Sequence, residues 1–152
     1  MLTIRKTTIS EFFGADNIQT LLDKYAEESA MHGLPHPKAK IDLYEQLERV
    51  GILYPISAFL DDVLIGFIFI VSPIMPHYSE RISTAESFFV AKEHRKTGAG
   101  TKLRHAAEQY AKEIGALGLL MSAPLGSDLA EVLPRVGYVE TNRVFFRSFN
   151  VE

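Results

Sequence analysis

The chain has 152 residues and a mass of 17.0 kDa, which fits a single domain over residues 1–152 and leaves little room for a second one. Hydrophobic residues make up 47% of it and charged residues 23%, which excludes a disordered or fibrous protein, and the formal net charge of −3 argues against a dedicated nucleic-acid-binding protein. The absence of cysteine excludes disulfides, thiolate metal sites, iron–sulfur clusters and a cysteine nucleophile.

No segment has the pattern of a signal peptide or of a membrane-spanning helix. The first six residues lack an apolar stretch. The longest apolar run, residues 63–71, is too short to cross a bilayer as a helix. We therefore expect a cytoplasmic protein without a membrane partner.

The first part of the chain predicts one strand and two helices. Residues 2–5 alternate between apolar and polar side chains, as a strand does. Apolar residues at helical spacing over residues 18–29 predict a helix that Asp16 or Asn17 caps. A second helix is expected over residues 41–50. Tyr25 of the first helix and Ile41 and Tyr44 of the second are assigned to inward faces, as core residues.

From residue 53 the pattern changes to that of strands. Residues 54–59 and 63–71 predict a hairpin that turns at Asp61 and Asp62. The second of these strands is apolar on both faces, so we expect it to be central and covered by helices on both sides.

The rest of the chain predicts, in order, a loop over residues 72–79, a strand over 83–90, a long helix over 98–114, a buried strand over 117–121, a short helix capped by Ser127 or Asp128, and two closing strands around 138–140 and 144–149. This order predicts an α+β fold with three αβα layers. Its central sheet is expected to be mixed and mostly antiparallel, with six to seven strands and about four helices.

Residues 88–103 carry the clearest chemical signal, because an apolar strand leads through a basic loop into a helix. Gly98 and Gly100 allow the backbone to approach a ligand closely. Free N–H groups at the helix start then point to one place, where the helix dipole favours an anion. Four basic side chains add positive charge there: Lys92, Arg95, Lys96 and Lys102. The segment therefore predicts a phosphate-binding site.

Two common phosphate motifs do not fit this segment. Lys102 stands two places after Gly100, whereas a P-loop lysine directly follows its glycine. Leu103 stands where a Rossmann fingerprint requires its third glycine.

The segment resembles the signature of the GNAT superfamily of acetyl-CoA-dependent N-acetyltransferases. That signature, Arg/Gln-x-x-Gly-x-Gly/Ala at the start of the third helix, is matched by Arg95-Lys96-Thr97-Gly98-Ala99-Gly100. The order of elements also resembles the family fold over nearly the whole chain. Near its end, Arg135-Val136-Gly137-Tyr138 is similar to the family's Lys-x-Gly-Phe signature.

The resemblance implies acetyl-CoA as co-substrate and assigns residues to it by position. The pyrophosphate would bind the backbone amides of Lys96, Thr97, Gly98, Ala99, Gly100 and Thr101, with help from the Thr101 hydroxyl. Arg95 would lie along the phosphates. The backbone of Phe88, Phe89 and Val90 would pair with the pantetheine arm like an additional strand.

The implied reaction transfers acetyl to a primary amine of a small molecule or a protein. An amine attacks a thioester only when neutral, and a lysine-like amine needs roughly 4–5 kcal/mol to lose its proton at pH 7. Glu86, on the strand before the loop, is the candidate base, and we expect its apolar neighbours to desolvate it. The alternative for Glu86 is that it is a carboxylate at the end of a strand that forms a salt bridge and has no catalytic role. Without cysteine, direct attack in a ternary complex is the simple route.

The general acid is less well defined by the sequence. Leu133 stands where the family often has a tyrosine, so Tyr78 or a water is the candidate that protonates the thiolate. The alternative is that Tyr78 is an ordinary aromatic residue of the loop, without a catalytic role. No metal is expected, because Gly33 and Pro35 break the helix that would align His32 with His36.

Two rivals to the enzyme remain open, and so does the oligomeric state. One is a non-catalytic acyl-CoA-binding or regulatory module on the same fold. The other is a nucleotide-binding protein with a glycine-rich helix start. Many relatives form homodimers, and the resemblance makes a homodimer possible here.

Overall fold

The computed structural model describes residues 1–149. Its elements, in chain order, are β1 (Leu2–Lys6), α1 (Ile9–Phe13), α2 (Ile18–Ser29), α3 (Ile41–Arg49), β2 (Leu53–Leu60), β3 (Val63–Val71), β4 (Ile74–Met75), β5 (Glu80–Arg81), β6 (Ser83–Val90), the 3-10 helix η1 (Lys92–Thr97), α4 (Ala99–Glu113), β7 (Leu119–Leu120) and α5 (Asp128–Arg135). Among these residues, no helix is both long and apolar enough to cross a membrane.

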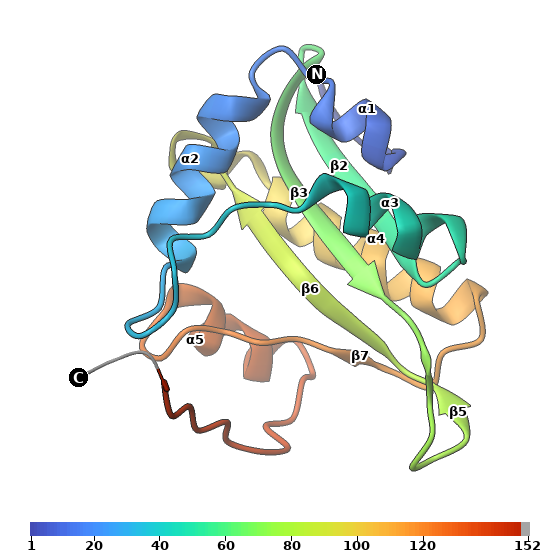
Figure 1. The fold of residues 1–152 in the computed structure, drawn as a ribbon. Helices are drawn as coiled ribbons and strands as arrows, with labels where there is room; N and C mark the ends of the chain where they lie inside the picture. Colours follow the sequence, from blue (N-terminus) through green and yellow to red (C-terminus); the bar gives the residue numbers. More distant parts are fainter. Residues whose placement is uncertain (150–152) are drawn as a thin grey trace.

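Five strands form the main sheet in the order β1-β2-β3-β6-β7 (Figure 1). Neighbouring strands are antiparallel except β6 and β7, which run parallel. Strands β4 and β5 form a separate two-stranded sheet within the segment that we expected to be a loop. The α+β fold with a mixed, mostly antiparallel sheet is confirmed, although the sheet has five strands rather than six to seven.

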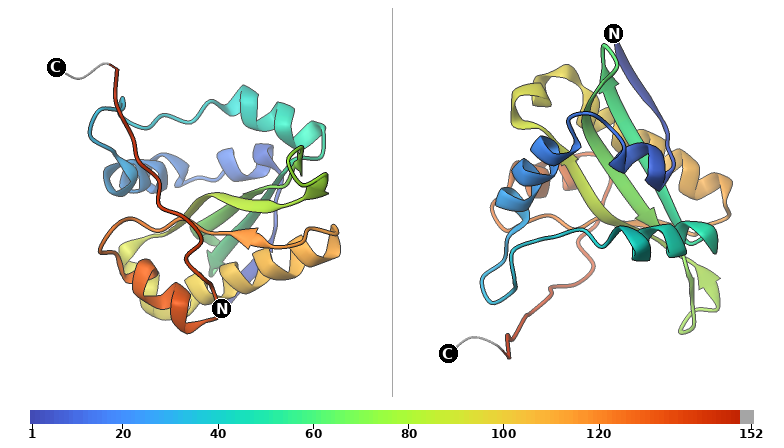
Figure 2. Two further views of the ribbon diagram at one scale, coloured as in Figure 1. Left: turned by 90° about the horizontal axis from the view of Figure 1, so that it is seen from below. Right: turned by 45° about the horizontal axis from the view of Figure 1, so that its top comes forward.

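Helices cover both faces of this sheet and make the three expected layers (Figure 2). On one face, Phe12 of α1 and Leu21 of α2 pack against Phe67 and Phe69 of β3. The phenylalanine rings meet edge to face, with the Phe12 and Phe67 centroids 4.9 Å apart. On the other face, α4 packs its buried alanines and Leu103 against isoleucines of β2 and β3.

The hairpin of β2 and β3 forms as the sequence predicts. Asp61 and Asp62 adopt left-handed backbone angles, with φ of 49° and 67°, which suit a tight hairpin turn. β3 is central and buried on both faces. Gly66 is required within it, because a Cβ there would lie 2.8 Å from the carbonyl oxygen of Phe89 on β6.

Two helices were missed from the sequence, each with a local cause. α1 is only five residues long, too short to show helical periodicity, and its signal is the cap: Thr8 accepts a hydrogen bond from the Glu11 amide. The basic loop after β6 winds into the 3-10 helix η1. A smaller error concerns Ile41, which is exposed instead of facing inward from α3.

The C-terminal part of the chain differs most from the prediction. Ser127 caps α5 as expected, by accepting a hydrogen bond from the Ala130 amide. However, β7 has two residues only, and Leu117 and Leu120 beside it are exposed instead of buried. The two closing strands around 138–140 and 144–149 do not form. Their apolar side chains therefore lack the paired neighbours that would stabilise a strand.

Candidate active site on β6

The edge of β6 that faces away from β3 is open over most of its length. β6 pairs with β3 from Thr84 to Val90. It pairs with β7 only through Ser83 and Thr84, after which the two strands diverge. Beyond Thr84, backbone groups on this edge have no strand partner among residues 1–149, so an extended ligand can add there.

A β-bulge determines where Glu86 points. The pairing with β3 shifts by one residue between Phe69 and Ile70, which leaves Glu86 as the extra residue on β6. Strict alternation would place Glu86 with Phe88 on the α4 face, where Ala85 also packs. The bulge turns Glu86 to the opposite face, towards α3. Bulges commonly redirect side chains next to active sites in this way.

Tyr44 of α3 donates a hydrogen bond to the Glu86 carboxylate. Its hydroxyl lies 2.6 Å from Oε1 and 3.2 Å from Oε2. Packing against Phe69, with the ring centroids 5.4 Å apart, holds the Tyr44 ring in place. Burial and the hydrogen bond to Glu86 raise the pKa of Tyr44, so this hydroxyl remains a donor at neutral pH.

Tyr25 of α2 also lies close enough to Glu86 for the carboxylate charge to change its pKa. Burial, followed by the Glu86 charge, raises the pKa of Tyr25 to about 12. On the strand itself, the neighbouring Ser87 hydroxyl is buried, and its interaction with the Tyr25 hydroxyl partly offsets this rise in the pKa of Tyr25. Glu86 thus lies near two protonated phenols and a buried hydroxyl.

The predicted catalytic residues occupy different settings. The Glu86 side chain is exposed, so apolar neighbours do not desolvate it as we expected from the sequence. Its partner is a phenol, and no salt bridge to it is recorded among residues 1–149. Tyr78 is 61% exposed at the tip of the β4–β5 hairpin, which projects beyond the start of β6 (Figure 1).

The predicted phosphate loop ends in an open helix start. Gly98 has φ of 87°, a left-handed conformation that favours glycine, and no side chain caps α4 from this position. The Ala99 amide donates to the Thr97 hydroxyl, and the amides of Gly100 and Thr101 belong to the first turn, whose N–H groups lack intrahelical acceptors. The loop therefore presents backbone donors beside the end of β6.

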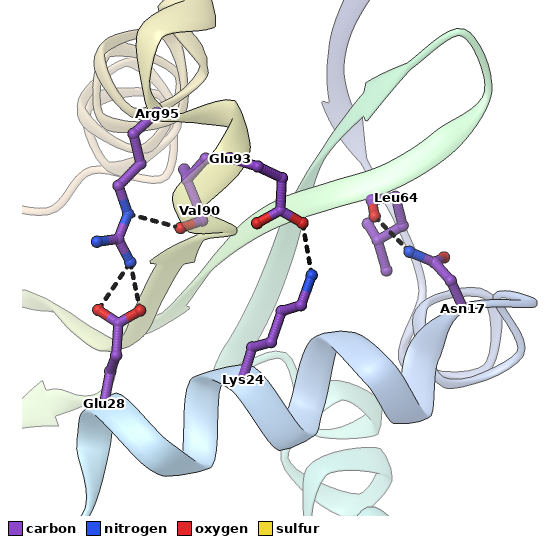
Figure 3. A network of polar contacts seen from close by, with 7 residues as sticks. All are labelled: Asn17, Lys24, Glu28, Leu64, Val90, Glu93 and Arg95. Carbon is purple, nitrogen blue, oxygen red and sulfur yellow. Dashed lines mark hydrogen bonds and ion pairs between the residues drawn. The ribbon is translucent and has the colours of Figure 1, made fainter.

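Two ion pairs connect this loop to α2 (Figure 3). The Arg95 guanidinium contacts both carboxylate oxygens of Glu28 at 2.7 Å and donates through Nε to the Val90 carbonyl at 2.9 Å. Lys24, one turn earlier on α2, pairs with Glu93. The Arg95 side chain thus points to α2, and it would have to leave Glu28 to lie along a phosphate.

Sequence reasoning missed Tyr25, Tyr44 and Ser87 as members of the site. Both tyrosines were assigned to the inward faces of helices as core residues. The available signal was chemical, because a tyrosine on a buried face needs a hydrogen-bond partner for its hydroxyl. Among residues 1–149, no group of three or more His, Asp or Glu side chains is arranged to hold a metal ion.

Several solved structures share the fold of this chain. A ribosomal-protein-alanine N-acetyltransferase from Brucella melitensis biovar Abortus 2308 matches with a TM-score of 0.76 and 19% identity, over 98% of each chain. An aminoglycoside acetyltransferase from an uncultured soil metagenomic sample matches with a TM-score of 0.73 and 16% identity, over 99% of this chain and 97% of that one. AAC(6')-Iy, in complex with the bisubstrate analogue CoA-S-monomethyl-acetylneamine, matches with a TM-score of 0.70 and 19% identity over 97% of each chain.

At these identities the structures establish the fold, and the sequence comparison establishes the family. No curated protein matches the chain significantly. The family model for the acetyltransferase (GNAT) family matches residues 17–125, which include Glu86 and the loop before α4. Since this match covers well over half of the chain, the protein belongs to the GNAT family of acetyltransferases.

Proposed function

We propose that the protein transfers acetyl from acetyl-CoA to a primary amine by direct attack in a ternary complex. One observation carries this proposal: the open edge of β6 leads into the glycine-containing start of α4 and carries Glu86 on its bulge. Family membership supports the reaction class. A cytoplasmic location stays a prediction from the sequence.

The residues around β6 and α4 fit acetyl-CoA. A Cβ on Gly98 would meet no atom within 4 Å, and one on Gly100 would make ordinary contacts with Val90 and Phe88 at 3.9 and 4.0 Å. Packing within the chain therefore does not require the second glycine, whose missing side chain leaves room at the helix start.

The proposed cofactor contacts follow from this arrangement. Phe88, Phe89 and Val90 would pair through their backbone with the amide groups of the pantetheine arm. The amides from Lys96 to Thr101 would bind the pyrophosphate, which the positive end of the α4 dipole favours. When bound, acetyl-CoA supplies the thioester carbonyl that the amine attacks.

Glu86 is the proposed base for the attacking amine. Its carboxylate already accepts a hydrogen bond from Tyr44, and its other lone pairs are available to an ammonium group or a bridging water. Because the Glu86 side chain is exposed, an incoming amine can reach it without the fold opening. Tyr78 stays the candidate that protonates the departing thiolate, and Tyr78→Phe is the variant that tests this role.

The acceptor is proposed only as a class, a small-molecule amine or a protein amino group. The similar structures include one protein named for acetylating an alanine of a ribosomal protein and others named for acetylating aminoglycosides. An acceptor panel should therefore contain amino sugars, amino acids and peptides with free N-termini.

The absence of cysteine makes the assay simple, because a thiol reagent will detect only released CoA. We expect acetyl-CoA to raise the melting temperature and at least one amine of the panel to release CoA thiol. Mass spectrometry of that amine should show one added acetyl group. Stabilisation by ATP but not by CoA would contradict the proposal and favour the nucleotide-binding alternative.

A non-catalytic acyl-CoA-binding module is the second candidate, and one position favours it. Leu133 is buried where the family often has a tyrosine, so no phenol is available there. This candidate predicts stabilisation by acetyl-CoA without thiol release from any amine in the panel. It also predicts that Glu86→Gln changes nothing measurable.

A further inference from the structure

The loop between α2 and α3, residues 30–40, carries basic side chains and no acidic ones. Its four basic side chains are all exposed: His32, His36, Lys38 and Lys40. Within residues 1–149, none of the four forms an ion pair. The α2–α3 loop therefore presents unpaired positive charge, although the chain as a whole has a net charge of −3.

The α2–α3 loop lies beside the proposed base. It passes from α2 to α3 on the face of the sheet to which the bulge turns Glu86 (Figures 1 and 2). Lys40 is the N-cap residue of α3, and its carbonyl accepts a hydrogen bond from the amide of Tyr44, one turn later, at 3.2 Å. The hydroxyl of Tyr44 in turn donates to Glu86. Because residues four apart are neighbours on the surface of a helix, a molecule bound at Glu86 lies within reach of the Lys40 side chain.

The acidic side chains of the neighbouring helices do not neutralise this loop. On α3, Asp42 is exposed and stands two residues before Tyr44, so the two side chains lie on different sides of the helix. On α2, Glu28 already forms an ion pair with the loop before α4. The other two acids of α2 stand two residues before and two residues after Tyr25, which faces Glu86, so they lie on other sides of that helix. An acceptor therefore meets a carboxylate on the sheet and unpaired cations on the loop.

We propose that Lys38 and Lys40 bind an anionic group of the acceptor, so that the preferred substrate is a small amine that also carries a carboxylate or a phosphate. The ammonium group of such a molecule is attracted to Glu86, and its anionic end is attracted to the two lysines. The same lysines repel an amine that carries further positive charges, which adds to the discrimination. This inference rests on the proposed function, because it assigns the acceptor of the same reaction.

Three amines with the same four-carbon spacing test the inference. n-Butylamine has an uncharged far end, γ-aminobutyrate has a carboxylate there, and putrescine has a second ammonium group. We expect kcat/KM, measured by thiol release at neutral pH, to be about fivefold or more higher for γ-aminobutyrate than for n-butylamine, and lowest for putrescine. Glucosamine 6-phosphate compared with glucosamine tests the phosphate. A preference in the sugar pair alone identifies a phosphate as the anionic group, and a preference in the butyl series alone identifies a carboxylate.

The variant Lys38→Gln/Lys40→Gln tests the two lysines. We expect the ratio of kcat/KM between the anionic and the uncharged amine of each pair to fall to within about twofold of one. Both side chains are exposed, so the melting temperature should stay unchanged. Lys112→Gln is the matched control, because Lys112 is exposed on α4, which covers the other face of the sheet, and it should keep the preference. Added salt should weaken the preference of the unchanged protein, since salt screens exposed charges.

The outcomes separate this inference from the proposed function. Equal rates within each series, or faster acetylation of putrescine, would overturn the anionic acceptor while the transfer reaction still stood. A preference that survives in Lys38→Gln/Lys40→Gln would overturn the assignment of the two lysines. If acetyl-CoA with any of these amines, or with the wider acceptor panel, released no CoA thiol, the proposed function would be wrong, and this inference with it.

Discussion

β3 and β6 lie side by side in the sheet and are both rich in apolar residues, but they differ in their partners. β3 pairs along its length with β2 on one side and from Gly66 to Val71 with β6 on the other, and it is nearly fully buried. β6 shares the pairing with β3, yet after Thr84 its second edge has no strand partner in the part of the chain that the structure describes. A strand that is paired and buried on both sides contributes stability, whereas a strand with a free edge can also bind a ligand. Changes in β3 should therefore lower stability, and changes around β6 should lower activity.

The largest expected effect is the loss of stability in Phe67→Ala, on β3. The Phe67 side chain is 2% exposed and packs edge to face against Phe12 and Tyr25. Truncation of a buried phenylalanine costs about 3–5 kcal/mol of the free energy of unfolding, or roughly 10 °C in melting temperature. We expect kcat of the folded variant at 20 °C to stay within about twofold.

Val63→Ala is the matched control for Phe67→Ala, because Val63 begins the same strand but is 51% exposed. Its melting temperature should fall by at most about 2 °C. If Phe67→Ala lost its activity while its melting temperature stayed unchanged, the assignment of β3 to stability would be wrong.

Glu86→Gln, on β6, should show the opposite pattern. Loss of a general base typically lowers the rate by roughly 100-fold or more. We expect this fall in kcat/KM, measured by thiol release at pH 7, with a melting temperature within about 2 °C of the unchanged protein, because the side chain is exposed. Full activity of Glu86→Gln between neutral and mildly acidic pH would remove Glu86 as the base.

Tyr44→Phe should have an intermediate effect, through Glu86. The variant keeps the ring that packs on Phe69 and removes the hydroxyl that orients the carboxylate. A hydrogen bond to a charged group contributes about 1.5–3 kcal/mol, so we expect kcat to fall about tenfold while KM for acetyl-CoA changes little. The pKa of Tyr44 is raised, so its proton is retained on both sides of neutrality, and the defect should be equal at pH 7 and pH 9.

Tyr54→Phe is the control for Tyr44→Phe. The Tyr54 hydroxyl donates to the Gly51 carbonyl and its ring packs on Tyr110 of α4, away from Glu86. Its kcat should be unchanged. Equal losses of kcat in the two variants would mean that Tyr44 acts through general stability and does not position the base.

The comparison of β3 with β6 also explains how much of the fold and of the site could be predicted from the sequence. β3 and β6 begin and end at the expected residues, because burial on both faces leaves a continuous apolar run with clear ends. Gly98 and Gly100 at the start of α4 likewise indicated, from the sequence alone, where the chain passes from a strand to a helix.

Features that depend on distant parts of the chain were not predictable. The bulge at Glu86 comes from the pairing with β3, and the hydrogen bond from Tyr44 joins residues 42 positions apart in the sequence. The prediction of the two closing strands was wrong for a related reason. The apolar pattern of residues 144–149 shows a capacity to pair, but it does not specify a partner strand within the chain.

The smallest expected effect decides the role of the Arg95 side chain at the end of β6. Glu28→Gln removes the carboxylate that Arg95 contacts while the bond from Arg95 to the Val90 carbonyl remains possible. Because both side chains are nearly half exposed, the pair contributes only about 0–1 kcal/mol. Because Arg95 contacts Glu28, we expect it, contrary to the position that the family resemblance implies, to remain beside α2 when acetyl-CoA binds, so KM for acetyl-CoA should change less than about twofold.

Lys24→Gln is the matched control, because it removes the other ion pair between α2 and the loop without touching Arg95. If Arg95 must leave Glu28 to reach the phosphates, the two variants will differ. Freed from its carboxylate, Arg95 would then bind acetyl-CoA more tightly in Glu28→Gln, and KM would fall by about fivefold or more, while Lys24→Gln would stay near the unchanged protein. Equal and small effects in both variants would instead mean that the ion pairs hold the loop against α2, and that the phosphates depend on the backbone amides at the start of α4.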